Sequence, residues 1–483
     1  MFCFPTTQFP MTVEDVNRYF QHLDDALSGF SPTQLRHKVA EDFPNYHHIG
    51  SYCDPLDPQE RDQVRKIASN QLKGFSFDPL LSFNMVQPKY ATEILHPDCS
   101  CFRRLKRKER PIKSCSHRDR LLYACWNFYL SGLHKSWLVK RRLENSISAY
   151  VPRTGKSNAH YAKLAFDYVQ GRASYSAVAI DIKGFFDQIP HGPLYSNLIE
   201  LTGKDGKLEP VDFRLYKATT TYNYVERDKV DLALRLDTAP GMLMTRFKKN
   251  WQKLRDSNLL RKNEGKGIPQ GLACSGVLAN IVMMQFDRKI ADLTSSYGSL
   301  YIRYADDIFL AAPDKSTLQH LYDQVAHELE IMQLPLADKK TEWFHLLKDD
   351  TIHPKISYLG LTCQGTAVSV RMNGVNKFYE RTRRFIFSYV LTCRKRGKKP
   401  SLKRIRAIFG HTGRRNYYAY LRRASKVFEQ DSRYQAKGIK GVMRKQTGWL
   451  EDRFEEASIA PLTTESHSMV DCRMCTCPLQ KDG

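Results

Sequence analysis

Three aspartates stand where a folded chain could bring their carboxylates together for phosphoryl-transfer chemistry. Asp181 ends the apolar run 175–180, and the pair Asp306–Asp307 separates the apolar runs 299–304 and 308–312. Two-metal phosphoryl transfer needs carboxylates from separate elements that converge on two divalent ions about 4 Å apart. Oxygen ligands suit Mg²⁺, with Mn²⁺ as the alternative. Each position taken alone is weak evidence for a catalytic site, because acids at strand ends are usually solvated turn residues.

The runs that flank these acids predict β-strands, because they are short, apolar and bounded by polar residues. The runs 299–304 and 308–312 predict a hairpin, with Ala305, Asp306 and Asp307 in its tight turn. Elsewhere the patterns predict a helix over 272–290, a third β segment over 356–361, and a mainly helical region over 376–430 that breaks at 397–400. Short strands mixed with helices indicate an α+β fold.

Positive charge dominates the chain, with 75 Lys and Arg against 51 Asp and Glu and a net charge of +24. A polyanion, most commonly nucleic acid, is the expected partner of such a protein. The segment 103–120 holds nine Lys or Arg in eighteen residues, and 381–445 holds twenty-one with two acids. Aromatic residues interleave in the second segment, which favours nucleic-acid contact over a merely solvated basic face. The arginines predicted to make this contact are Arg414, Arg415, Arg422 and Arg423.

No targeting or membrane signal is visible. The N-terminal residues 1–5 do not begin a secretory signal, and no stretch approaches the roughly 18 apolar residues of a membrane span. A cytoplasmic protein is expected, in which most of the 12 cysteines are reduced. Two cysteine clusters, at 99–115 and 472–477, lack the two well-spaced ligand pairs of a zinc site. Zinc is therefore the less favoured interpretation, and it stays open for the second cluster.

Five motifs give these observations a common explanation. In chain order they are an aspartate motif, a Pro-Gln-Gly motif, a Tyr-x-Asp-Asp box, a lysine motif and a Leu-Gly strand, at 181–191, 267–276, 304–307, 338–341 and 358–361. In these motifs and their order, the chain resembles the reverse transcriptase family over about residues 100–430. The resemblance implies an α+β right-hand polymerase, a nucleotidyltransferase that makes DNA on an RNA template.

The resemblance also implies a division of the chain. The predicted parts are an N-terminal extension (1–79), fingers (80–174), a palm (175–371, with a helical insert at about 196–262), a thumb (372–430) and a basic C-terminal tail (431–483). The palm is expected to be a small antiparallel sheet backed by helices. The oligomeric state is left open by the sequence.

Five residues acquire roles at the metal site and the sugar from this resemblance. Asp181 and Asp306 would bind both metal ions, and Asp307 would complete the acidic cluster. The carbonyl of Ile182 would add an oxygen ligand. Phe186 stands where the family places an aromatic ring against the sugar, which leaves no room for a 2′-hydroxyl and implies selection of deoxynucleotides. Its alternative role is that of an ordinary core aromatic.

Further residues would hold the incoming nucleotide. Gln270 would contact it from a loop whose glycines allow a close approach. Lys340 would assist the departure of pyrophosphate, with Lys339 as the alternative, and either could be a surface charge. Lys113 and Arg120 lie in a segment similar to the fingers of bacterial reverse transcriptases, where a basic side chain would hold the triphosphate.

Other segments bear on the lineage within the family. The segment 221–226 resembles bacterial defence-associated reverse transcriptases, which implies a stand-alone cytoplasmic enzyme of antiphage defence that copies a structured non-coding RNA. The alternatives are a retron type, whose Asn-Ala-x-x-His signature 158–162 does not meet, a group II intron type, whose long maturase region is missing, and a protein-primed or template-independent DNA polymerase. An RNA-dependent RNA polymerase or an inactive RNA-binding protein is less compatible with Phe186 and with three intact aspartates.

Overall fold

The structure is a computed structural model, in which the described residues are 11–27, 58–69, 76–96, 99–152, 154–203, 205–227, 229, 258–263, 265–409, 420, 423–424, 426–428, 448 and 450–459. The chain divides into two compact units. The first unit comprises Met1–Gln87, Glu109–Gly155 and Ser174–Trp343, and the second unit comprises Pro88–Lys108, Lys156–Ala173 and Phe344–Gly483.

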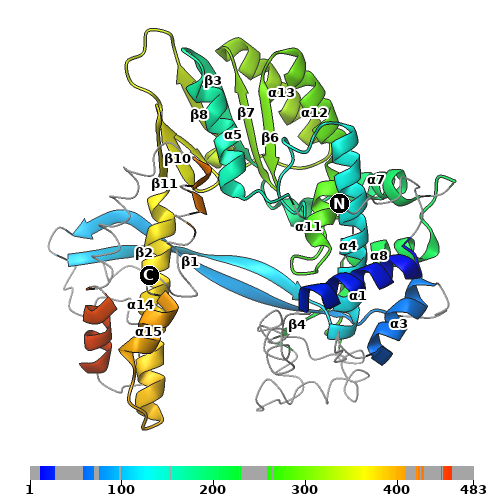
Figure 1. Cartoon of the computed structure of the whole chain (residues 1–483), viewed down its shortest axis with the longest axis horizontal. Helices are drawn as coiled ribbons and strands as arrows, with labels where there is room; N and C mark the ends of the chain where they lie inside the picture. The colour runs from blue at the N-terminus through cyan, green and yellow to red at the C-terminus, as the bar shows by residue number, and fades with distance from the viewer. Residues whose placement is uncertain are drawn as a thin grey trace. The chain divides into compact units, whose positions relative to one another are not determined.

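A four-stranded sheet, here named the central sheet, organises the first unit (Figure 1). Its order is β6-β7-β3-β8, and its strands are β3 (Tyr175–Asp181), β6 (Leu300–Tyr304), β7 (Asp307–Ala312) and β8 (Glu342–Leu346). β7 runs antiparallel to both β3 and β6. Most residues of these three strands are buried, which explains the continuous apolar runs of the sequence. The three predicted strands are confirmed.

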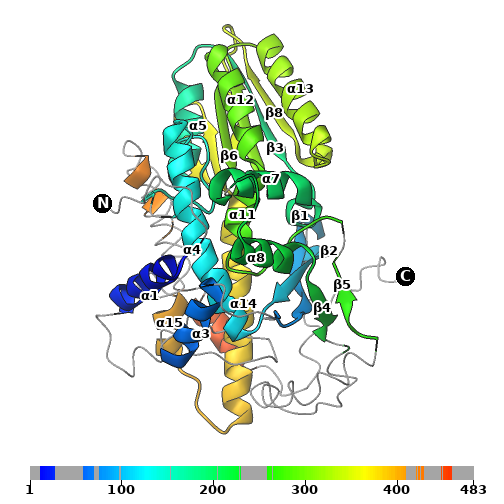
Figure 2. The ribbon, with the colours of Figure 1, turned by 90° about the vertical axis from the view of Figure 1, so that its right-hand side faces the viewer.

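Two helices pack on the central sheet, as Figure 2 shows from the side. α12 (Met284–Ser296) contacts β6, and α13 (Lys315–Ile331) contacts β3 and β7. Asp314 caps α13, because its carboxylate accepts a hydrogen bond from the amide of Thr317 at 2.8 Å. The predicted antiparallel sheet backed by helices is therefore present.

The predicted helix over 272–290 is two helices, α11 (Ser275–Val282) and α12, which meet at Met283. The amide of Met283 bonds back to carbonyls of the last turn and ends α11. The side-chain amide of Asn197 donates to the last two carbonyls of α11, at 2.8 and 3.1 Å. The prediction of one helix was wrong because the apolar pattern continues across a break that a distant side chain stabilises.

Of the remaining helices of the first unit, α1, α3 and α7 contact α4, as α11 does. These remaining helices are α1 (Val13–Leu27), α3 (Pro58–Ala68), α4 (His117–Lys140), α6 (Phe185–Gln188), α7 (His191–Thr202), α8 (Pro210–Thr220) and the short helix η2 (Asp338–Lys340). A second sheet has the order β2-β1-β4-β5, with β1 (Leu80–His96), β2 (Cys99–Ser114), β4 (Asn223–Glu226) and β5 (Arg261–Lys262). The predicted insert thus contributes strands as well as helices.

The second unit combines helices with a three-stranded antiparallel sheet of order β11-β10-β9. Its elements are α5 (Asn158–Gln170), β9 (Ile356–Tyr358), β10 (Leu361–Gln364), β11 (Ala367–Val370), α14 (Met372–Lys395) and α15 (Leu402–Phe409). The predicted β segment 356–361 is split by a turn at Leu359 and Gly360, where φ is 48° and 83°. The predicted break after α14 is confirmed at Gly397, whose φ is 62°.

These elements confirm the predicted α+β class. Among the helices within the described ranges, none is long and apolar enough to cross a membrane. Of the first cysteine cluster, Cys115 is a buried free thiol, and burial raises its pKa to about 12. The side chains of Cys99 and Cys101 and the cluster 472–477 lie outside the described part of the chain.

Candidate active site

The central sheet brings the three predicted aspartates to one end of neighbouring strands. Asp181, the last residue of β3, stands opposite Asp307, the first residue of β7. The amide of Ile182 donates to the carbonyl of Asp306 at 3.1 Å, which ties the hairpin turn to the end of β3. Strand register therefore places the aspartate motif beside the Tyr-x-Asp-Asp box, although Ile182 and Asp306 lie 124 positions apart in the sequence.

The hairpin turn is shorter than predicted. It consists of Ala305 and Asp306, and Asp307 already pairs with Tyr304 as part of the ladder. Ala305 is buried and has φ 58°, a left-handed conformation that residues with a side chain rarely adopt. The prediction that Asp307 lies in the turn was wrong because the left-handed residue closes the turn within two positions.

Charge is unbalanced at these carboxylates. Burial raises the pKa of Asp306, and the negative charge of Asp181 raises it further, while Lys340 and Arg110 oppose the shift. The ammonium of Lys340 forms an ion pair with the carboxylate of Asp181. Two carboxylates that disfavour each other's charge form a site where added positive charge is stabilising.

The donor set suits hard divalent cations, because it offers carboxylate oxygens only. Within the described ranges, no group of three His, Cys, Asp or Glu is gathered closely enough to hold a metal ion as it stands. Asp181 contacts Lys340 instead, so its carboxylate would exchange that partner for a cation. The residues that would hold such ions are Asp181, Asp306 and Asp307. The carbonyl ligand predicted at Ile182 stays a prediction.

Phe186 lies on the short helix α6 beside the end of β3. Its ring is partly exposed, whereas Phe185 beside it is buried in the core. The ring centroid is 6.3 Å from that of Tyr150, in an edge-to-face arrangement. The carbonyl of Phe186 accepts a hydrogen bond from the amide of Ile268 at 2.9 Å. Phe185 is a core residue, and Phe186 packs partly buried against the same core, so its predicted role at the sugar stays a prediction beside its alternative role as a core aromatic.

Gln270 lies on a loop that packs closely on other backbone. Its side-chain nitrogen is 3.3 Å from both carboxylate oxygens of Asp187, and its carbonyl accepts from the amide of Lys113 at 2.8 Å. Gly271 has φ 130°, and a Cβ there would lie 2.6 Å from the carbonyl oxygen of Lys113. The glycine therefore permits the approach of the loop to β2.

The two basic residues predicted in the fingers, Lys113 and Arg120, lie in different surroundings. The ammonium of Lys113 lies over the rings of Tyr222 and Tyr224, at 5.8 and 5.1 Å from their centroids. Burial lowers the pKa of Lys113, and Asp187 opposes that shift. Arg120 lies on α4, where its charge opposes the raised pKa of the Cys115 thiol.

Two residues near the carboxylates were not assigned roles from the sequence. The charge of Arg110 acts on both Asp306 and Tyr150, and the Tyr150 hydroxyl is influenced by Asp306 in turn. Burial raises the pKa of Tyr150, and Asp306 adds to the shift. Arg110 lies in the basic segment 103–120, as Lys113 and Arg120 do, so its place in that segment was the available signal. Of the predicted nucleic-acid contacts, Arg414, Arg415 and Arg422 lie outside the described residues, and Arg423 is exposed.

The family model "Reverse transcriptase (RNA-dependent DNA polymerase)" matches residues 106–363, slightly more than half of the chain. The chain belongs to the reverse transcriptase family. The matched region contains the three aspartates together with Phe186 and Gln270. This reverse transcriptase therefore has the right-hand polymerase fold that its motifs predicted. Members of the family generally use divalent metal ions.

Solved telomerase structures are similar to this reverse transcriptase at low identity. The apo telomerase from Candida tropicalis is 14% identical with a TM-score of 0.39, over 80% of this chain and 64% of that chain. The telomerase from Candida albicans in complex with the TWJ fragment of telomeric RNA is 13% identical with a TM-score of 0.36, over 74% of this chain and 55% of that chain. The chain thus spans less than two thirds of either telomerase.

Proposed function

We propose that this reverse transcriptase is an RNA-directed DNA polymerase that adds deoxynucleotides with the help of two Mg²⁺ ions. The observation that carries the proposal is the register of the central sheet, which sets Asp181 opposite Asp307 and bonds Ile182 to Asp306. Acidic side chains on adjoining strands are the arrangement that two-metal phosphoryl transfer uses. Bound there, the ions would activate a primer hydroxyl and neutralise the phosphates.

The chain's own residues would position the reactants. In the reaction the primer hydroxyl gives its proton to solvent and its oxygen bonds to the α-phosphorus, while the bond from the α-phosphorus to the oxygen of the β-phosphate breaks and pyrophosphate leaves. Lys340, whose ammonium contacts Asp181, would place positive charge beside the leaving group and give it a proton. Arg110, whose charge acts on Asp306, would bind the triphosphate. Phe186 would lie against the sugar.

The test uses the full chain with RNA and DNA primers on an RNA template. Asp306→Asn keeps the side-chain volume but removes the charge, so primer extension in Mg²⁺ should fall to background. Asp314→Asn is the control, because Asp314 caps α13 at the exposed end of the helix. Synthesis that persists in Asp306→Asn would overturn the assignment, and a loss of synthesis supports it where the variant and the control melt at similar temperatures.

Selection of deoxynucleotides is the second part of the proposal. Phe186→Val removes a ring that is partly exposed beside Tyr150, so ribonucleotides should be incorporated more readily. The measurement is the ratio of kcat/KM for a deoxynucleotide and its ribonucleotide. An unchanged ratio would mean that the ring does not read the sugar.

The finer role proposed is cytoplasmic antiphage defence with a structured non-coding RNA as template. Its support is the segment 221–226 and the net charge of +24. Residues 223–226 of the segment form β4, and Tyr222 and Tyr224 contact Lys113, whose amide bonds to Gln270, so the segment belongs to the same part of the molecule as the loop of Gln270. Sequencing the RNA and DNA that copurify with the protein from its host tests this role. Random cellular RNA with no defined DNA product would contradict it.

A further inference from the structure

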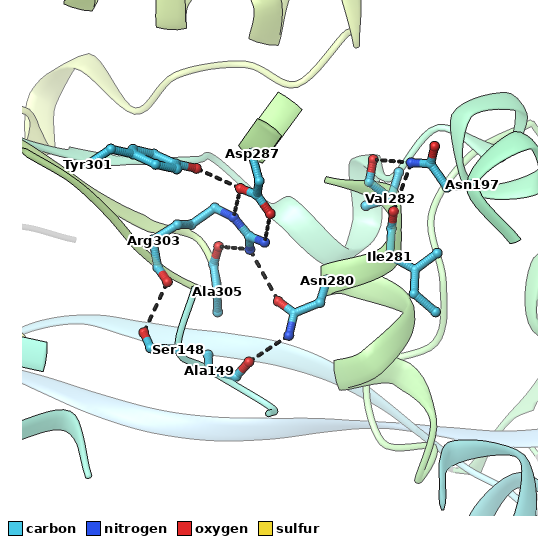
Figure 3. Close-up of polar contacts among 10 residues, drawn as sticks. All are labelled: Ser148, Ala149, Asn197, Asn280, Ile281, Val282, Asp287, Tyr301, Arg303 and Ala305. Atoms are coloured by element: carbon cyan, nitrogen blue, oxygen red, sulfur yellow. Dashed lines mark hydrogen bonds and ion pairs between the residues drawn. The ribbon is translucent and has the colours of Figure 1, made fainter. Parts of the chain in front are cut away.

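A buried arginine holds the turn that carries Asp306 (Figure 3). Arg303 lies in β6, its side chain is fully excluded from solvent, and one terminal nitrogen donates a hydrogen bond of 3.0 Å to the carbonyl of Ala305. Ala305 is the left-handed residue that turns the chain towards Asp306. The guanidinium therefore fixes the turn from the interior, one residue before the aspartate pair.

Asp287 of α12 sets the orientation of the guanidinium. Its carboxylate accepts hydrogen bonds from Nε of Arg303 at 2.7 Å and from a terminal nitrogen at 2.5 Å. Tyr301 donates a third hydrogen bond to this carboxylate at 2.6 Å. A two-point contact between a planar guanidinium and a carboxylate allows a single orientation. The nitrogen that points at Ala305 is therefore held in place.

Asn280 of α11 extends the network to a second segment, residues 146–149, here named the strap. Its side-chain oxygen accepts a hydrogen bond from Arg303 at 3.3 Å, and its side-chain nitrogen donates to the carbonyl of Ala149 at 2.6 Å. The strap runs beside β6, and two backbone hydrogen bonds of 2.8 and 3.2 Å join it to Arg303. Figure 3 shows Asn280 between the guanidinium of Arg303 and the carbonyl of Ala149, and Ser148 at the backbone carbonyl of Arg303.

The strap leads directly into Tyr150. This residue has φ 58°, and its ring lies so close to Gly276 that a Cβ there would be 2.6 Å from the ring. The same ring is the edge-to-face neighbour of Phe186. A hydrogen bond to the carbonyl of Ala149 therefore fixes the residue that supports the proposed sugar contact.

Stability alone does not explain this network. A buried ion pair is a poor source of stability, since an apolar pair of similar volume often stabilises a protein as well or better. We propose that Arg303, fixed by Asp287 and Asn280, is a positioning residue that sets the Asp306–Asp307 turn and Tyr150 relative to each other. The proposal rests on the proposed function for its chemistry, and it requires no contact between Arg303 and the nucleotide.

Two consequences can be measured. Residues that orient metal ligands commonly change metal affinity by about 10–100-fold when they are replaced, so a loosened turn should bind divalent cations more weakly. A loosened strap should release Tyr150 from Phe186, so discrimination between deoxynucleotides and ribonucleotides should decrease. A role in stability alone predicts neither effect in a protein that is still folded.

Three variants separate these consequences. The apolar variant combines Arg303→Met, Asp287→Leu and Tyr301→Phe, and it removes both charges and the hydroxyl that would lose its acceptor. Asn280→Ala keeps the ion pair and cuts the link to the strap, so it should fold even where the apolar variant does not. Asn197→Ala is the matched control: Asn197 is a buried asparagine like Asn280, but its side chain donates to the carbonyls of Ile281 and Val282, away from the turn (Figure 3).

The first measurement is binding of Mn²⁺ to the full chain, followed by electron paramagnetic resonance. The apparent Kd should rise at least about tenfold in the apolar variant, rise less in Asn280→Ala, and stay unchanged in Asn197→Ala. The second measurement is sugar discrimination, which should fall in Asn280→Ala and not in the control. A folded apolar variant that binds Mn²⁺ as the wild type does would overturn the proposal, as would an equal loss in Asn197→Ala.

Mn²⁺ binding needs no catalysis, so the two proposals can fail separately. A wild-type chain that binds Mn²⁺ and makes no DNA would contradict the proposed function, while the ranking of Kd values among the variants would still decide the role of Arg303. A wild-type chain that makes DNA, with variants that match it in both measurements, would contradict the positioning role and leave the proposed function standing.

Discussion

The turn at Ala305–Asp306 and the loop at 267–271 are held by opposite means. The turn depends on a buried side chain, Arg303, that bonds to its backbone from the interior. The loop depends on backbone contact: Gly267 donates to Ile189 at 2.8 Å, and a Cβ on Gly267 would lie 2.7 Å from the carbonyl oxygen of Asp187. One segment needs a particular buried side chain, and the other needs side chains to be absent.

Because of this difference, the turn and the loop are sensitive to different kinds of substitution. A turn held by charged groups loses its position when one partner is removed, because the remaining charge is left buried. A loop held by close backbone contact loses its position when atoms are added, because packed interiors do not yield easily. Substitutions that delete atoms and substitutions that add them therefore test the two segments separately.

The largest effect is expected from breaking the ion pair. Arg303→Met should lower the free energy of unfolding by about 3–5 kcal/mol, because it leaves the carboxylate of Asp287 buried without its cation. Urea denaturation measures the change. The apolar variant should be closer to the wild type than the single substitution is, since it removes the stranded charge. Equal losses in the two variants would show that shape, and not charge, holds the turn.

The sequence predicted the parts of this site that depend on local pattern. The strands that end at Asp181 and begin at Asp307 follow from apolar runs, and the loop glycines follow from their motif. The hairpin and the antiparallel pairing of β3 with β7 are then enough to bring Asp181 beside Asp306 and Asp307. These features are encoded within a few residues of where they act.

The network behind the turn was not predictable in the same way. Arg303 interrupts an apolar strand, and a basic residue there indicates a solvent-facing position, yet its side chain is fully buried. Its partners, Asp287 and Asn280, lie on two helices that were predicted as one. A side chain from α7 bonds to the carbonyls at the break, and the local pattern carries no sign of that contact. Tertiary contacts set both features.

Adding atoms to the loop should have the next largest effect. Gly267→Ala meets both a positive φ of 82° and the carbonyl of Asp187, so stability should fall by about 2–4 kcal/mol. Gly265→Ala is the matched control, because Gly265 has φ 83° and a Cβ there would meet nothing within 4 Å. That control should lose only about 1 kcal/mol. Similar losses would mean that backbone conformation, and not close contact, makes the loop sensitive.

Acid should lower the free energy of unfolding through His134, which is buried within the electrostatic influence of Arg303. His134 is buried against the ring of Trp137, and burial together with the positive charge of Arg303 lowers its pKa to about 3. The unfolded chain takes up a proton near pH 6.5, so stability is present above that pH and is lost as the pH falls towards 3. Between pH 8 and pH 5 the loss should be about 2 kcal/mol.

The measurement is urea denaturation of the wild type and of His134→Leu at several pH values. Without the imidazole ring, the free energy of unfolding should fall less steeply as the pH falls below 6.5. The free energies of the two proteins at pH 8 need not be equal, because only their change with pH is compared. The buried carboxyls Asp119 and Asp212 act with the opposite sign, because burial raises their pKa to about 6 and about 7. Their contribution is lost as the pH rises, so the difference between the two proteins isolates His134. Parallel curves would contradict the shift.

The smallest effect tests whether the strap needs its side-chain bond to β6. The Ser148 hydroxyl donates to the carbonyl of Arg303 at 3.0 Å, and the Ser148 amide donates to the same carbonyl at 3.2 Å. Ser148→Ala should therefore cost about 1 kcal/mol, because the carbonyl keeps a backbone partner. Sugar discrimination should stay at the wild-type value, because the link from Asn280 to Ala149 is intact. If discrimination fell as far as in Asn280→Ala, then the Ser148 hydroxyl would position Tyr150 as well. The strap would then depend on several hydrogen bonds along β6, and not, like the turn, on the side chains of one buried network.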